Sequence, residues 1–106
     1  MDVELLVVPG CANQHSAAAL LRTALDDIGL PGATVRTTVI TTQQQADQRG
    51  FTGSPTIRLD GDDPFAQPGR PSALACRVYP GPDGPSPLPA LSDLRQALKR
   101  AAEPNR

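Results

Sequence analysis

Aromatic residues are scarce in this chain of 106 residues, which has one tyrosine, two phenylalanines and no tryptophan. The core must therefore be built mainly from aliphatic side chains, and few rings are present to stack on nucleic-acid bases. A basic surface is lacking as well, because the formal net charge is −1 and the acids and bases are interspersed. Both absences argue against nucleic acid as a partner.

Long apolar runs are also missing, and none approaches the roughly 20 residues that a membrane-spanning helix needs. Asp2 and Glu4 make the amino terminus acidic where a signal peptide would be basic. We therefore expect a cytoplasmic protein with no membrane partner. Cys11, Cys76 and His15 are the only cysteines and histidine, too few for a structural zinc site without help from carboxylates. We predict no metal and no cofactor, and free thiols in a reducing compartment.

What is present is the pattern of one small α/β domain over residues 1–103, followed by a frayed tail at 104–106. Apolar and alternating runs predict four strands, and stripes at spacings of three and four predict three helices. The β-α-β opening implies parallel strands with a right-handed crossover. We expect a four-stranded mixed sheet with helices on both faces and the strand order second, first, third, fourth. The predicted strands are 3–8, 34–40, 56–59 and 73–79, and the predicted helices are 13–28, 43–49 and 91–101.

Two short motifs lie at the turns of this β-α-β-α-β-β-α order. Pro9-Gly10-Cys11 separates the first strand from the first helix, and Gly53-Ser54-Pro55-Thr56 precedes the third strand. Together with an apolar last helix, they resemble the thioredoxin-like fold over the whole chain. The resemblance implies that Cys11 is the reactive cysteine and that Pro55 is the proline facing it. A cis bond there would present the backbone of Ser54 to a bound peptide or thiol compound.

A closer resemblance is to short proteins named as thioredoxin-family or alkylmercury-lyase-like proteins. The shared segments are V-P-G-C-x-N, G-F-x-G-S-P-T, D-P-F-A, C-R-x-Y and L-R-x-A-L, which begin here at Val8, Gly50, Asp63, Cys76 and Leu94. One departure is clear. Gln14 stands where a redox-active C-x-x-C motif has its second cysteine, so ordinary dithiol exchange within the motif is not expected.

Cys11 is the predicted catalytic residue, because a helix N-terminus favours a thiolate through unpaired N–H groups and the helix dipole. The thiolate is the nucleophile in attack on a disulfide, a sulfenic acid or a soft metal. The plain alternative is a cysteine retained on a fold that no longer does redox work. His15 lies one turn away and could take the thiol proton, but an exposed histidine is the simpler interpretation. Asn13 is expected to cap the helix rather than to react.

Cys76 alternates with Leu74 and Val78 on one apolar face of the predicted fourth strand, which favours a small core residue. The functional alternative is a second, resolving thiol. Two strand spacings of about 4.8 Å separate it from the first strand, whereas a disulfide needs Cα atoms within about 7 Å. The acids Asp60, Asp62 and Asp63 do not match an EF-hand and predict a turn.

The leading hypothesis is a thioredoxin-like protein that uses Cys11 as a lone nucleophilic thiol, that is, a monothiol oxidoreductase. Its partner would be a small thiol or a protein disulfide. One alternative is an organomercurial lyase-like or soft-metal-binding protein, which would need Cys11 and Cys76 close together. Another is a non-catalytic binding module that keeps the fold and uses its surface.

Overall fold

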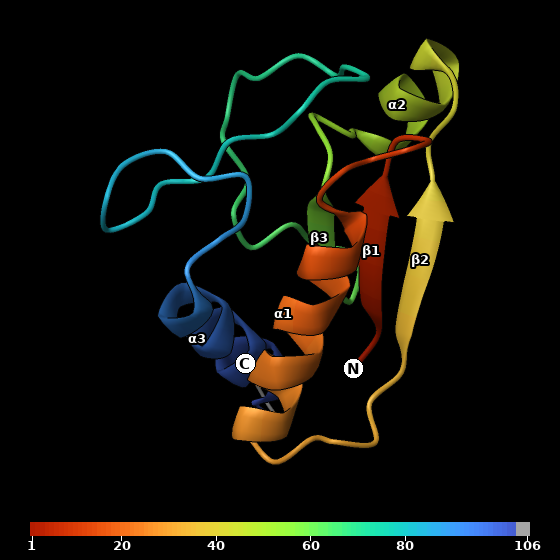
Figure 1. Cartoon of the computed structure of the whole chain (residues 1–106). Coiled ribbons are helices and arrows are strands. Elements are labelled where there is room, and N and C mark those ends of the chain that lie inside the picture. Colours follow the sequence, from red (N-terminus) through yellow and green to blue (C-terminus); the bar gives the residue numbers. More distant parts are fainter. Residues whose placement is uncertain (104–106) are drawn as a thin grey trace.

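The computed structural model describes residues 1–103. It shows three strands, which form a small sheet, and three helices (Figure 1). The predicted tail at 104–106 lies outside the described residues. Each helix in the described part of the chain is too short or too polar to span a lipid bilayer. The elements in chain order are β1 (Val3–Val7), α1 (Gln14–Asp27), β2 (Val35–Val39), α2 (Gln43–Arg49), β3 (Thr56–Leu59) and α3 (Leu91–Ala102).

The sheet has three strands in the order β2-β1-β3. β1 runs parallel to β2, with Val3 opposite Val35, and antiparallel to β3, with Val3 opposite Leu59. All five residues of β1 are buried, whereas no residue of β2 is fully buried. The continuous apolar run of β1 and the alternating pattern of β2 therefore correspond to a central and an edge strand.

The prediction of a fourth strand, and so of a four-stranded sheet, is wrong. Within residues 1–103, the segment 73–79 makes only isolated bridges, a parallel one from Cys76 to Ser54 and an antiparallel one from Tyr79 to Ser86. Tyr79 exchanges both backbone hydrogen bonds with Ser86, at 2.7 and 2.8 Å. These groups are therefore unavailable to β3, and the expected antiparallel pairing does not form.

The face of this segment that was expected to point into the core is exposed, and the opposite face is buried. Leu74 and Val78 are 41% and 50% exposed, and Cys76 between them is exposed as well. Arg77 and Tyr79 are buried instead. Burial alternates with a period of two only from Cys76 to Tyr79, because Ala75 is exposed as well. The partners that hold Arg77 inward lie far away in the sequence.

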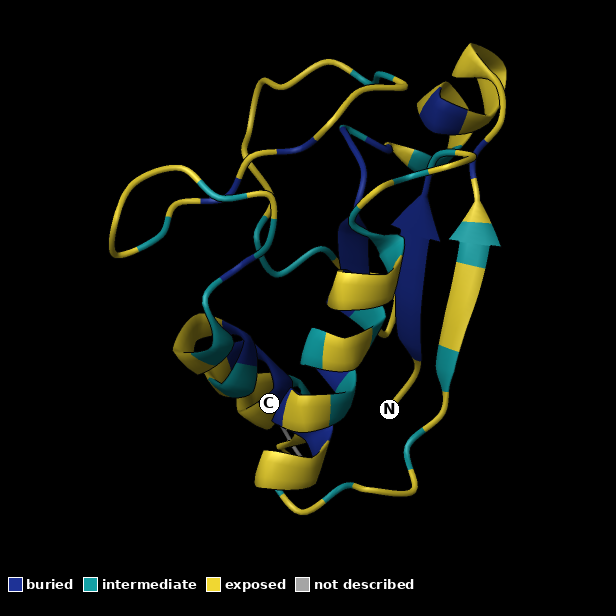
Figure 2. Ribbon diagram, in the orientation of Figure 1, coloured by how far each residue is buried: buried dark blue, intermediate teal, exposed yellow. Residues whose placement is uncertain are grey.

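Two layers of side chains cover the sheet. α1 and α3 lie on one face, where Leu21, Leu25, Leu94 and Leu98 pack against the inward residues of β1 and β3. α2 lies near the carboxyl ends of β1 and β2, and its Ala46 joins a second cluster with Leu6, Ile40 and Phe51. Figure 2 shows β1 buried along its length, whereas exposed residues lie on parts of the helices and on the loops.

Candidate functional site

Cys11 lies in the turn between β1 and α1. Its N–H donates to the carbonyl of Val8 at 3.2 Å, and its own carbonyl accepts from the N–H of Gln14, the first residue of α1, at 3.3 Å. Gly10 precedes it with a positive φ of 69°, a conformation that favours glycine. The Cys11 side chain is half-buried and packs against the main core. The thiol is therefore held in place but remains partly open to solvent.

The hydroxyl of Ser54 points at this thiol. It donates a hydrogen bond to Sγ of Cys11, with 3.0 Å between Oγ and Sγ. The same oxygen accepts from the N–H of Val8 at 3.1 Å, and Ser54 is only 1% exposed. A serine hydroxyl has a single proton to donate. When Cys11 is a thiolate it has no proton to donate, so the Ser54 hydroxyl is then the donor of this bond.

The backbone of Ser54 is already engaged by the chain itself. The Ser54–Pro55 peptide bond is cis. The N–H of Ser54 donates to the carbonyl of Ala75 at 2.7 Å, and the Ser54 carbonyl accepts from the N–H of Arg77 at 2.9 Å. In this structure the Ser54 backbone is therefore not presented to a bound peptide or thiol compound, contrary to the expectation from the resemblance.

Arg77 anchors the segment that runs beside Ser54, and no motif in the sequence indicates this role. It is 5% exposed and forms an ion pair with Asp63 at 2.6 Å. Its guanidinium also donates to Thr56 Oγ1 and to the carbonyl of Phe65, and lies 4.6 Å from the ring centre of Tyr79. A buried arginine satisfied in this way fixes the register of the whole segment.

Gly53 allows the segment that carries Arg77 to lie close to the chain before Ser54. Its φ is +152°, and a Cβ built on it would lie 2.9 Å from the Cβ of Arg77. Only glycine therefore fits without a shift of one backbone or the other. Gly53 was part of the recognised motif, but the close approach of Arg77 could not be inferred from the motif alone.

The remaining predicted site residues lie around this centre with different roles. Asn13 occupies the N-cap position of α1, but its side chain makes no capping hydrogen bond, contrary to expectation. His15 is exposed in the first turn of α1. Cys76 is exposed rather than a core residue, and both cysteines are free thiols. Asn13 and Cys76 line one shallow hollow of about 310 Å³, together with Arg77, Val78, Pro85, Ser86 and Pro87.

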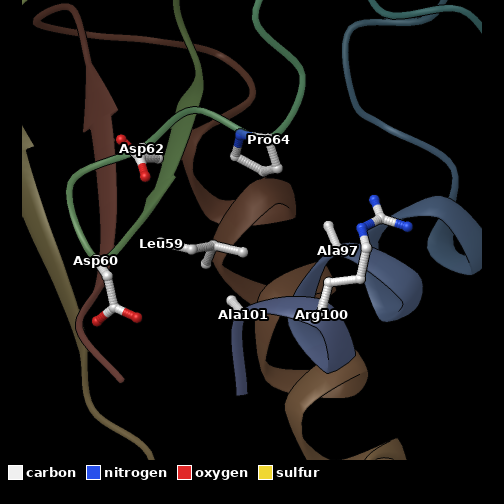
Figure 3. Close-up of a pocket in the computed structure, with 7 residues that line it drawn as sticks. All are labelled: Leu59, Asp60, Asp62, Pro64, Ala97, Arg100 and Ala101. Carbon is white, nitrogen blue, oxygen red and sulfur yellow. The ribbon is translucent and has the colours of Figure 1, made fainter. Parts of the chain in front are cut away.

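A second hollow, of about 370 Å³, lies at the other end of the sheet (Figure 3). Asp60 and Asp62 lie on its loop side and Arg100 of α3 lies across from them. The acids belong to a tight turn, because Leu59 and Asp62 bond to each other in both directions. The prediction of a turn is confirmed here. Leu59 pairs with Val3 at the start of β1, so this hollow is remote from Cys11.

Within residues 1–103, no three histidine, cysteine or acidic side chains gather closely enough to hold a metal ion. Comparison of the chain with protein-family models gives no match. Comparison with curated proteins and with solved structures gives none either.

Proposed function

We propose that this chain is a thioredoxin-like protein that uses Cys11 in thiol–disulfide exchange. The observation that carries the proposal is the hydrogen bond from the buried Ser54 hydroxyl to Sγ of Cys11. The element order around the site also supports it, because Cys11 lies in the turn between β1 and α1 and its sulfur meets Ser54, which lies just before β3.

The contact favours the reactive form of the sulfur. A hydrogen bond donated to a charged acceptor is stronger than one donated to a neutral acceptor. Ser54 therefore stabilises the thiolate of Cys11 more than the thiol. The N-terminus of α1 acts in the same direction, because the helix dipole favours negative charge there.

The proposed reaction needs no cofactor. The thiolate of Cys11 attacks one sulfur of an external disulfide, the disulfide bond breaks, and one thiolate leaves as a mixed disulfide forms on Cys11. An external thiol then attacks the mixed disulfide, takes the bound group away as a new disulfide and returns Cys11 to its thiolate. One such cycle replaces one half of the substrate disulfide with the external thiol. A second external thiol then displaces the remaining substrate thiol, so that two external thiols supply the two electrons of the full reduction.

The test measures the exchange of Cys11 with a chromogenic aromatic disulfide at pH 7, in a Cys76→Ser variant so that only Cys11 reports. The folded protein is compared with the same chain unfolded in urea. Folded Cys11 should react about tenfold faster, as a stabilised thiolate does. Ser54→Ala should remove most of this advantage. Ser92→Ala, which changes an exposed serine of α3, should leave it intact. A folded chain that reacts no faster than the unfolded chain would refute the proposal.

A further inference from the structure

Cys76 lies beside the residue that touches Cys11. The isolated parallel bridge joins Cys76 to Ser54 through the backbone of Ala75 and Arg77. Bridged neighbours lie about 4.8 Å apart, and paired residues project their side chains to the same face. Ser54 in turn donates its hydroxyl hydrogen bond to Cys11. Ser54 is therefore the common neighbour of the two cysteines, through its hydroxyl for Cys11 and through its backbone for Cys76.

The position of Cys76 is both accessible and anchored. Its exposure follows from the inverted face of the segment 73–79. The next residue, Arg77, is buried in its ion pair with Asp63, which holds the segment against the domain. Asn13, two residues after Cys11, lines the same hollow of about 310 Å³ as Cys76. The hollow therefore links the start of α1, close to Cys11 in the chain, with the segment that carries Cys76.

We infer that Cys76 is the resolving thiol of Cys11, so that the two cysteines form a redox pair although no C-x-x-C motif is present. This inference rests on the proposed thiol–disulfide exchange at Cys11. Sequence spacing argued against such a pair because a strand was expected between the two residues. In the structure no strand lies there, and Ser54 contacts Cys11 through its hydroxyl and is bridged to Cys76 through its backbone.

The reaction balances with an external disulfide as the oxidant. The Cys11 thiolate attacks one sulfur of the disulfide, which releases one thiolate and leaves a mixed disulfide on Cys11. The Cys76 thiolate then attacks Sγ of Cys11 and releases the second thiolate. A disulfide between Cys11 and Cys76 forms, two electrons pass to the substrate, and the two thiol protons pass to solvent or to the released thiolates.

The experiment treats the reduced protein with one equivalent of an aromatic disulfide and follows released thiolate and intact mass. The wild-type chain should release two thiolates per disulfide consumed and lose the mass of two hydrogen atoms, with no reagent attached. Peptide mapping without reductant should then find Cys11 joined to Cys76. A wild-type chain that instead keeps a stable adduct on Cys11 would overturn the inference while leaving the proposed exchange at Cys11 standing. An adduct confined to Cys76 would overturn both.

Two variants provide the controls. Cys76→Ser should release one thiolate and keep the reagent on Cys11. The double variant Cys76→Ser with Val78→Cys moves the second thiol two residues along the same exposed face, away from the bridge to Ser54. It should behave like Cys76→Ser if the position beside Ser54 matters. Release of the second thiolate at the wild-type rate in this double variant would contradict the assigned position.

Discussion

Single residues decide whether this site can form, and Ser54 shows how. Every hydrogen-bonding group of Ser54 has a partner: its N–H and carbonyl bond to the segment 73–79, and its hydroxyl joins the N–H of Val8 to the sulfur of Cys11. A residue whose hydrogen-bonding groups all have partners is held rigidly. Such rigidity keeps the Ser54 hydroxyl in position to donate to the sulfur. The reactivity proposed for Cys11 therefore depends on contacts made by residues distant in the sequence.

Arg77 is expected to be a main contributor to stability at the residue scale. Arg77→Ala should lower the free energy of unfolding by about 3 kcal/mol, because it leaves the half-buried carboxylate of Asp63 without its partner. Arg70→Ala, at an exposed position, should change it by less than about 0.5 kcal/mol. Urea denaturation of both variants provides the measurement. Equal stabilities for the two variants would show that the buried ion pair is not holding the segment.

Gly53 gives a second prediction at this scale. Gly53→Ala should destabilise the fold by more than about 1 kcal/mol, because an added Cβ would overlap Arg77 and the positive φ disfavours any side chain. The matched control is Gly32→Ala, where a Cβ would meet no atom within 4 Å. Thermal melting should separate the two. If Gly53→Ala had the same melting temperature as Gly32→Ala, the close approach of Arg77 to Gly53 would be disproved.

At the scale of elements, signals from neighbouring residues predicted helix bounds well, whereas the orientation of the segment 73–79 depends on residues distant in the sequence. α2 was expected at 43–49 and is found there, because Thr42 and Gln45 form a capping box and Gly50 closes the helix with a φ of 60°. Those signals lie within a few residues of the helix. The orientation of the segment 73–79 depends on Asp63, Thr56 and Phe65, so alternation alone could not show which face turns inward.

The central strand carries a buried carboxylate that ties β1, β2 and α2 together. Glu4 is 4% exposed, accepts from Thr38 Oγ1 at 2.6 Å and pairs with Arg49 at 2.7 Å. Burial alone would raise the pKa of Glu4. The hydrogen bonds from Thr38 and Arg49, with the charges of Arg49 and Arg36, hold that pKa below its usual range.

This cluster predicts how stability depends on pH. Because the folded-state pKa of Glu4 is lowered, its contribution is fully present above the unfolded value of about 4.5 and is lost as the pH falls through the folded value. The melting temperature should therefore fall more steeply below about pH 5 in the wild type than in Glu4→Gln. Asp2→Asn, which alters an exposed partner of Arg36, should have the smaller effect. Parallel acid profiles for the wild type and Glu4→Gln would contradict this role.

At the scale of the whole molecule, the two ends of the sheet differ in chemistry. The end where β1 finishes brings together Cys11, Ser54 and Cys76, and the other end holds the hollow between Asp60, Asp62 and Arg100. The central strand, the parallel crossover, α1 and α3 could be predicted from hydrophobic periodicity. The number of strands and the exposure of Cys76 could not, because they follow from the pairing of Tyr79 with Ser86 and from the partners that Arg77 meets across the fold.

The proposed disulfide also has a consequence for the whole molecule. A bond between Cys11 and Cys76 would close a loop over most of the chain and restrict the unfolded state, which is worth about 4 kcal/mol for a loop of this length. The oxidised wild type should therefore melt at a higher temperature than the reduced wild type. Cys76→Ser should show no such difference between oxidising and reducing conditions. Unchanged melting of the wild type on oxidation would argue against the bond.

The most direct test of the central claim is the rate of Cys11 alkylation at pH 7, in Cys76→Ser with and without Ser54→Ala. The folded Cys76→Ser chain should be alkylated about tenfold faster than the same chain unfolded in urea, because the Ser54 hydroxyl is placed against Sγ of Cys11. Ser54→Ala should remove most of that advantage, because it deletes this hydrogen bond. Equal rates for the folded and the unfolded chain, with and without Ser54→Ala, would contradict a catalytic role for Cys11.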